Sequence, residues 1–301
     1  MTSILPPDRL SLTSLRIFVA IAEERNLTRA AGREAIALSA ASKRLADLEA
    51  DFGVRLLDRT PRGMRLTAAG ESLLHHARRV LGAAQDLTAD MSDFRKGVRG
   101  HVRLLANLSA IVAYLPEDLE RFFLNHPDLR VDLQERPSLE VVRGVEEGQA
   151  ELGICSAHAD LQGLTVVPYK TDDLVVVMRA DHPLAGRGPL AFRDTLAFDH
   201  IGLHAESSIF MRSQRAARDE GMSLRRRIHV PGFDAVCRTV QAGLGVALIP
   251  APVFGILGSS MSLHAEALTD PWARREIVIV HQSARPLSAA AERLHDALRR
   301  G

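Results

Sequence analysis

The chain has 301 residues, 46% hydrophobic and 25% charged, a balance typical of globular proteins with more than one domain. Its net charge is +1, but the first 99 residues hold 16 basic and 12 acidic side chains, so a mildly basic head precedes a mildly acidic body. No run of about eighteen apolar residues and no basic start followed by an apolar stretch is present, so we expect neither a membrane span nor a secretory signal. The two cysteines, Cys155 and Cys237, show no disulfide framework or zinc spacing, and this usage indicates a cytoplasmic protein.

The amino-terminal segment predicts three short helices. Apolar residues recur at helical spacing from Leu12 to Ala22. Thr28 is placed to cap a second helix, and Ser39 is placed to cap a third, which Gly53 would end. Two short helices joined by a tight turn form a helix-turn-helix unit.

A β-hairpin is expected after these helices. Residues 54–57 and 64–66 have the composition of short strands, and the turn at 61–63 contains Pro and Gly. Such a hairpin is the wing of a winged helix, so we assign residues 1–66 to a winged helix-turn-helix domain.

A long helix should follow, capped by Thr67 and about 28 residues in length, and we assign residues 67–97 to this linker. Its apolar side chains alternate steps of four and three, the seam of a coiled coil, at Leu73, Ala77, Val80, Ala84, Leu87, Met91 and Phe94. The spacing favours self-association as a homodimer or homotetramer, and the alternative is a helix packed on its own domain. Gly97 and Gly100 would form a hinge.

Beyond residue 98 the pattern changes to alternating strands and helices, which predicts an α/β domain with mostly parallel sheets over residues 98–301. We expect strands at 102–106, 131–134, 152–155, 174–178, 228–230, 246–249 and 277–280. We expect helices at 111–125, 138–148, 208–220, 233–242 and 286–300. A region of this length and style suggests two lobes.

The chain resembles LysR-type transcriptional regulators in several segments that occur in the expected order. These segments are LRIFVAIAEERNLTRAAGREA, SKRLADLEADFGVRLLDRT, RLTAAGESLL, LPEDLERFFLNHPDLRVDL, HPLA and AGLGVALIP. The resemblance implies a winged helix-turn-helix, a dimerising linker helix and two lobes built like a periplasmic binding protein. It places lobe one at 101–170 and 271–301 and lobe two at 171–270, with the chain crossing near 169–171 and 269–271.

Short polar or basic side chains at the start of the third helix would reach DNA in the major groove. We expect Lys43, at a position commonly Arg in the family, to contact a base or a phosphate, and Arg65 to reach DNA from the wing. The alternative for each residue is a solvated surface side chain. The full set of expected DNA contacts is Thr28, Ser39, Ala40, Ser42, Lys43, Arg62 and Arg65.

A cleft between two α/β lobes is a natural site for a small molecule, because strand ends and helix N-termini meet there and favour carboxylates. By position, three strand-to-helix junctions of lobe one and two segments of lobe two correspond to the effector-binding loops of the family. The expected effector contacts are Ser109, Ser138, Ser156, His204 and Phe233, and the alternative for the serines is a plain helix cap. Arg136 is a candidate counter-ion, so we expect an anionic effector.

Enzyme motifs are missing from the sequence. No lysine follows a glycine as a P-loop requires, and neither H-E-x-x-H nor G-x-S-x-G occurs. His200 and His204 have metal-ligand spacing on a helix, but their segment has the composition of a strand and loop, so we expect no metal and no cofactor. Two alternatives to a DNA-binding regulator are a solute-binding protein, which would need an export signal and no DNA-binding head, and an α/β enzyme with an accessory DNA domain. RNA polymerase is a further expected partner beside double-stranded DNA.

Overall fold

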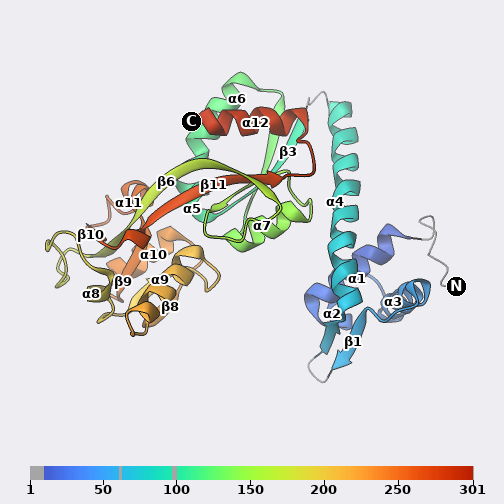
Figure 1. Ribbon diagram of the computed structural model, residues 1–301, viewed down its shortest axis with the longest axis horizontal. Coiled ribbons are helices and arrows are strands. Elements are labelled where there is room, and N and C mark those ends of the chain that lie inside the picture. Colours follow the sequence, from blue (N-terminus) through green and yellow to red (C-terminus); the bar gives the residue numbers. More distant parts are fainter. Residues whose placement is uncertain (1–9, 61–62, 97–99, 301) are drawn as a thin grey trace. The chain divides into compact units, whose positions relative to one another are not determined.

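The computed structural model describes residues 10–60, 63–96 and 100–300, and within the helix at 68–96 it leaves out the side chains at 85–86, 89–90 and 92–96. By its internal contacts the chain divides into two units. The first holds residues 1–96 together with Glu147–Gln149, and the second holds the rest. Figure 1 labels the helices and strands of both units.

Three helices form the core of the first unit: α1 (Leu12–Glu24), α2 (Leu27–Arg33) and α3 (Leu38–Phe52). They bury one shared apolar cluster, in which Phe18 and Ile21 of α1 and Leu45 of α3 are almost fully enclosed. Fully burying one aliphatic or aromatic side chain of this size stabilises the fold by about 1.5–3 kcal/mol. The three-helix prediction for this segment therefore agrees with the structure.

The helix caps differ from the prediction. The cap of α2 is Asn26, whose side chain accepts a hydrogen bond of 3.0 Å from the backbone N–H of Arg29, and Thr28 lies inside the helix. Helix α3 begins two residues earlier than expected, and its N-cap, Ala37, offers no side-chain oxygen, so Ser39 is not the cap. Gly53 ends α3 as predicted, with a positive φ of 66° that a glycine adopts without strain.

The wing is the antiparallel pair β1 (Leu57–Thr60) and β2 (Gly63–Leu66), so its first strand lies further along the chain than the expected 54–57. Helix α4 (Ala68–Lys96) follows, and the Thr67 hydroxyl caps it by accepting a 3.0 Å hydrogen bond from the N–H of Gly70, as predicted.

The apolar positions of α4 divide into two groups. Leu73 and Ala77, in the first half, pack into the core of the helix-turn-helix. Val80, Leu87 and Met91 are 41%, 64% and 53% exposed, although they are apolar. The first half of the apolar seam therefore packs against its own domain. The second half leaves an exposed apolar stripe, formed by Val80, Leu87 and Met91. Phe94 lies outside the described side chains.

In the second unit, one lobe is built on β3 (Gly100–Ala106), β4 (Leu129–Glu135), β5 (Leu152–Ser156) and β11 (Arg274–Gln282). Its helices are α5 (Leu108–Ala113), α6 (Leu115–Asn125), α7 (Ser138–Glu146) and α12 (Ala289–Arg300). The single helix expected at 111–125 is broken at Tyr114, because Pro116 in the first turn of α6 has no N–H to continue a helix from upstream.

The other lobe carries β7 (His200–Gly202), β8 (Arg226–His229), β9 (Val246–Pro250) and β10 (Leu263–Ala267). Its helices are α8 (Phe192–Thr195), α9 (Ser208–Asp219), α10 (Phe233–Gln241) and α11 (Ala251–Leu257). Strand β7 falls in the segment around His200 whose composition indicated strand and loop, whereas β10, α8 and α11 were not predicted.

One long strand, β6 (Leu164–Arg179), belongs to both lobes. It pairs with β11 as far as Asp173 and with β9 from Leu174, so the crossing lies just beyond the expected 169–171. The chain returns through a 3-10 turn, Pro271–Ala273, into β11, which runs beside β6 in Figure 1. Because β11, β9 and β10 all pair with neighbours in antiparallel fashion, the sheet is mixed and the expectation of mostly parallel sheets was wrong.

Candidate functional site

The start of α3 presents most of the expected DNA contacts to solvent. Ser39, Ala40 and Lys43 are exposed and Ser42 is half-buried on this helix, while Ala41 between them is fully buried in the core. Leu38 is also 47% exposed at the first position of the helix. Helix α3, the second helix of the helix-turn-helix, therefore presents hydroxyl and basic side chains to solvent beside the exposed side chain of Leu38.

The remaining expected contacts lie on α2 and on the wing. Thr28 is exposed in the first turn of α2, and Arg65 is exposed on β2, opposite Asp58 of β1. Arg62 lies outside the described residues.

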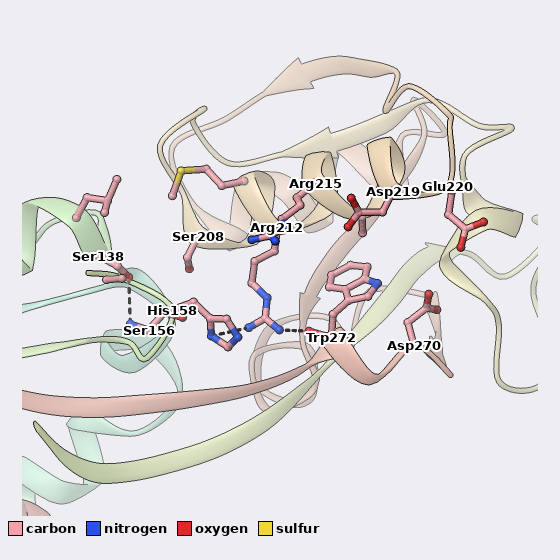
Figure 2. A pocket seen from close by; sticks show the side chains of 14 residues that line it. Ser138, Ser156, His158, Ser208, Arg212, Arg215, Asp219, Glu220, Asp270 and Trp272 are labelled. Carbon is pink, nitrogen blue, oxygen red and sulfur yellow. Dashed lines mark hydrogen bonds between the residues drawn. The ribbon is translucent and has the colours of Figure 1, made fainter. Parts of the chain in front are cut away.

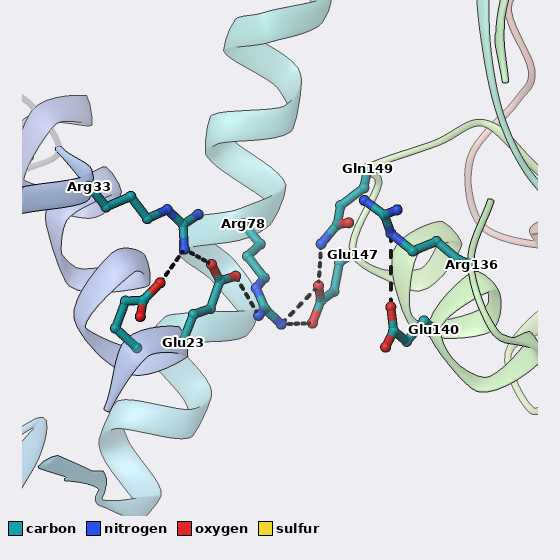
Figure 3. Close-up of polar contacts among 8 residues, drawn as sticks. Glu23, Arg33, Arg78, Arg136, Glu140, Glu147 and Gln149 are labelled. Atoms are coloured by element: carbon teal, nitrogen blue, oxygen red, sulfur yellow. Dashed lines mark hydrogen bonds and ion pairs between the residues drawn. The ribbon is translucent and has the colours of Figure 1, made fainter. Parts of the chain in front are cut away.

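A network of ion pairs joins α1 and α2 to α4. Figure 3 shows Glu23 of α1 between two guanidinium groups, with Arg33 at 2.7 Å and Arg78 of α4 at 2.8 Å. Arg33 thus stabilises the domain through its ion pair with Glu23, although it lies within the helix-turn-helix.

The effector domain contains a cavity of about 580 Å³, the size of a site for a small organic molecule (Figure 2). Lobe one lines it with residues after β4 and β5, lobe two lines it with α9, and the return crossing adds Trp272. The lining residues are Ser138, Leu139, Ser156, His158, Ala159, Ser208, Met211, Arg212, Arg215, Ala216, Asp219, Glu220, Asp270 and Trp272.

Arg212 is the central charged side chain of this cavity. It donates to the backbone oxygens of Trp272 and Arg274, the latter at 3.1 Å, and lies 3.2 Å from Nδ1 of His158. Burial lowers the pKa of Arg212, and the neighbouring Arg275 lowers it further. Burial and the same guanidinium lower the pKa of His158, so its ring stays neutral at pH 7.

Two serines form the lobe-one end of the cavity. The hydroxyl of Ser138 accepts hydrogen bonds from the backbone N–H of Ser156, at 3.2 Å, and from the Asn107 amide, at 3.3 Å. The hydroxyl of Ser156 is buried and has no hydrogen-bond partner. A buried hydroxyl without a partner costs about 1–3 kcal/mol, so it marks a place where a ligand atom would be stabilising.

Ser109 and His204 line a second, smaller cavity together with Ser138. Its volume is about 20 Å³, room for about one water molecule and too small for an organic effector. Ser109 is 5% exposed, and its hydroxyl already accepts a 3.2 Å hydrogen bond from Arg275. In this arrangement of the lobes the expected serines therefore do not all meet at one point, since Ser138 is shared between the two cavities.

Two further residues do not lie where we expected an effector. Phe233 is 2% exposed and belongs to the apolar core of lobe two. Arg136 is exposed: its guanidinium donates to Gln134 and to the backbone oxygen of Glu135, and lies 3.8 Å from Glu140 (Figure 3). Neither residue is free to contact an effector as the sequence suggested, because the Phe233 ring packs in the core and the Arg136 guanidinium bonds to nearby acceptors.

Sequence reasoning missed Arg212, Trp272 and the pair formed by Asp172 and Arg275. Trp272 is the only tryptophan of the chain and follows an expected lobe crossing, so its position was a usable signal. Nothing local in the sequence distinguishes Arg212 from the other arginines of α9.

The other reactive groups are enclosed. Burial raises the pKa of the Cys155 thiol to about 12, so this cysteine is a poor nucleophile at neutral pH. Burial lowers the pKa of His200 to about 4, and its Nε2 lies 3.1 Å from the backbone oxygen of Thr195. Within the described part of the chain no three His, Cys, Asp or Glu side chains gather as a metal site would need. No helix among the described residues is both long and apolar enough to cross a bilayer.

Comparison with known proteins matches both parts of the chain. The family model for the bacterial regulatory helix-turn-helix protein, lysR family, covers residues 12–71, and the model for the LysR substrate binding domain covers residues 95–301. The chain is 30% identical over 257 residues to the uncharacterized HTH-type transcriptional regulator YnfL of Escherichia coli, covering 80% of this chain and 82% of that one. The crystal structure of CbnR, a LysR family transcriptional regulator, matches with a TM-score of 0.67 at 22% identity, covering 97% of this chain and 99% of that one.

A winged helix-turn-helix joined to a two-lobed domain with a ligand-sized cavity defines a class of DNA-binding regulators controlled by small molecules. The chain belongs to the LysR family of bacterial transcriptional regulators. It is a DNA-binding transcriptional regulator with an effector-binding domain, not an enzyme.

Proposed function

We propose that this protein binds a two-part operator as a homodimer or homotetramer and that a small anionic molecule, bound between the lobes, sets its affinity for that DNA. The single observation that carries the proposal is the cavity between the lobes, because the half-buried guanidinium of Arg212 lines it. A ligand held there would touch both lobes and favour one arrangement of them.

We propose the functional bounds expected from the sequence, with residues 1–66 as DNA-binding domain, 67–97 as dimerisation helix and 98–301 as effector domain. The exposed stripe on α4 supports dimerisation, because three large apolar side chains in one row are disfavoured in water. Two DNA-binding heads on one dimer imply half-sites of approximate inverted symmetry.

The DNA contacts we propose are the exposed residues Thr28, Ser39, Ala40, Lys43 and Arg65, the half-buried Ser42, and Arg62 of the wing turn. Since its target is DNA, we place the protein in the cytoplasm. RNA polymerase is the partner through which bound regulator would change transcription.

The test is a binding titration of the full chain on the DNA upstream of its own coding sequence, with and without fractions of a metabolite library. We expect specific binding that is about 10³-fold tighter than to unrelated DNA and that shifts with one fraction. Equal affinity for both DNAs would refute operator recognition, and an affinity that no fraction changes would refute effector control.

Ser109→Val tests the expected role of Ser109 separately. The change removes a hydroxyl at nearly constant volume. If Ser109 contacts the effector directly, the effector's dissociation constant rises while DNA affinity is kept. Equal effector affinities would leave Ser109 with only its hydrogen bond from Arg275.

A further inference from the structure

We propose that the large cavity binds a small monocarboxylate with an apolar body, whose carboxylate is held by Arg212 and the Ser156 hydroxyl. The proposal rests on the proposed function and names the class of effector and the residues that select it. It also moves the centre of recognition away from Ser109, toward α9 and the return crossing.

The first support is the positive charge of Arg212. The acceptors of Arg212 are the two backbone oxygens and the neutral His158 ring, none of which carries a negative charge. The buried carboxylate of Asp172, whose charge acts on Arg212, already accepts hydrogen bonds from two nitrogens of the Arg275 guanidinium. Two guanidinium groups thus share one carboxylate, and a second anion would neutralise the excess charge.

The second support is the hydroxyl of Ser156. It is buried, lacks a partner and belongs to a residue that lines the same cavity. A carboxylate oxygen would accept its proton in a charge-assisted hydrogen bond, which is stronger than a bond between neutral groups. The neighbouring Ser138 hydroxyl is already used by two donors and only fixes the loop.

The body of the ligand is defined by the walls. Trp272 and Met211 offer half-buried aromatic and thioether surfaces, and Leu139 is 48% exposed at the edge of the cavity. Trp272 is held in place by an edge-on contact with Phe192, whose ring centroid is 5.0 Å away. An apolar or aromatic body would cover these surfaces.

The opposite end of the cavity excludes a second negative charge. Asp219, Glu220 and Asp270 lie there, away from the serines, as Figure 2 shows. Arg215 also lines the cavity, so its lining holds three carboxylates against two guanidinium groups; Arg193, which lies 3.7 Å from Glu220, does not line it. A dicarboxylate long enough to reach this end would meet like charges, so the site selects a single carboxylate.

The fluorescence of Trp272 reports binding directly, since the full-length chain has no other tryptophan. The probes are 3-phenylpropionate, its neutral amide, and the dicarboxylate 3-(4-carboxyphenyl)propionate, each titrated to about 10 mM, a range that detects weak binding. We expect a saturable change with the monocarboxylate and at least about tenfold weaker binding of the other two. No saturable change with the monocarboxylate, or equal binding of the amide, overturns the proposal.

Variants on one helix locate the anion site. Arg212→Met is expected to weaken 3-phenylpropionate at least about tenfold, whereas Arg218→Met, at an exposed position of α9 that does not line the cavity, changes it less than about twofold. Ser156→Ala removes a hydroxyl that has no partner among the described residues, so its melting temperature without ligand stays the same or rises while probe binding weakens. Equal effects of Arg212→Met and Arg218→Met would contradict the assignment.

DNA titrations with the same variants separate this inference from the proposed function. If a natural effector changes the DNA affinity of wild type and Arg212→Met equally, effector control stands and the assignment to this cavity fails. If 3-phenylpropionate binds as expected but the confirmed effector leaves DNA affinity unchanged, the ligand site stands and effector control fails.

Discussion

Arg275 and Asp172 stand directly opposite each other on β11 and β6 and form two parallel hydrogen bonds of 2.6 Å, with their side chains 2% and 0% exposed. Tyr114 also donates to this carboxylate, at 3.1 Å, and Arg275 reaches Ser109 at 3.2 Å. The pair therefore joins the two crossing strands to the helices of lobe one at the place where the chain passes between lobes.

Breaking this pair should destabilise the effector domain strongly. Arg275→Met leaves a buried carboxylate without its counter-ion, which costs about 3–5 kcal/mol of the free energy of unfolding. The double variant Asp172→Leu/Arg275→Met should regain most of that loss, because no buried charge remains. Thermal or urea unfolding measures both, and a single variant as stable as wild type would contradict the buried geometry.

Lys43→Ala should weaken specific DNA binding by about 1–3 kcal/mol if the side chain contacts a base. If it contacts a phosphate instead, specific and nonspecific binding should fall together, and the slope of log affinity against log salt should shrink by about one. Fluorescence anisotropy at several salt concentrations distinguishes the two. Arg299→Ala, an exposed arginine of α12, is the control for lost charge and should leave DNA binding unchanged.

Leu87→Glu should dissociate the oligomer, because it places a charge in the exposed apolar stripe of α4, where a partner helix would desolvate it. We expect the dimer dissociation constant to rise about tenfold or more, which corresponds to about 1.4 kcal/mol. Ile256→Glu is the matched control, since Ile256 is 52% exposed on α11, outside the stripe. Light scattering that shows the same mass for both variants would count against this interface.

His200 should make stability fall as the solution becomes acidic. Its pKa is lowered from 6.5 to about 4 by burial, so between these values the unfolded chain binds a proton that the folded chain does not. The folded state should lose about 2 kcal/mol between pH 7 and pH 5 from this group alone. His200→Gln lacks that dependence, so the melting temperatures of wild type and variant, plotted against pH, should converge as pH falls. Parallel pH dependences would show that folding does not lower the pKa of His200.

Periodicity and end signals predicted much of the fold from the sequence. The spacing of apolar residues predicted α1 and α4. Gly53 ends α3 and Thr67 caps the start of α4, as expected. The cap at Asn26 was missed because Thr28, two residues on, is also of a type favoured at helix N-caps. The mixed sheet was missed because strand direction depends on where the chain returns, which no local pattern records.

The candidate site shows the same limit. Ser138 and Ser156 could be found, because serines at strand ends are visible in the sequence. Arg275 and Asp172 could not, since they are 103 positions apart and meet only through the register of β6 with β11. Arg212 could not be found either, because only the folded structure shows that its acceptors are uncharged.

One small molecule and the operator should bind this protein with coupled free energies. The most direct measurement is the dissociation constant of a confirmed effector, followed by Trp272 fluorescence, with and without saturating operator DNA. Because linkage is reciprocal, an effector that changes DNA affinity must have its own affinity changed by the same factor, about 5-fold or more in typical coupling. Identical effector affinities in the free and DNA-bound protein would contradict the account.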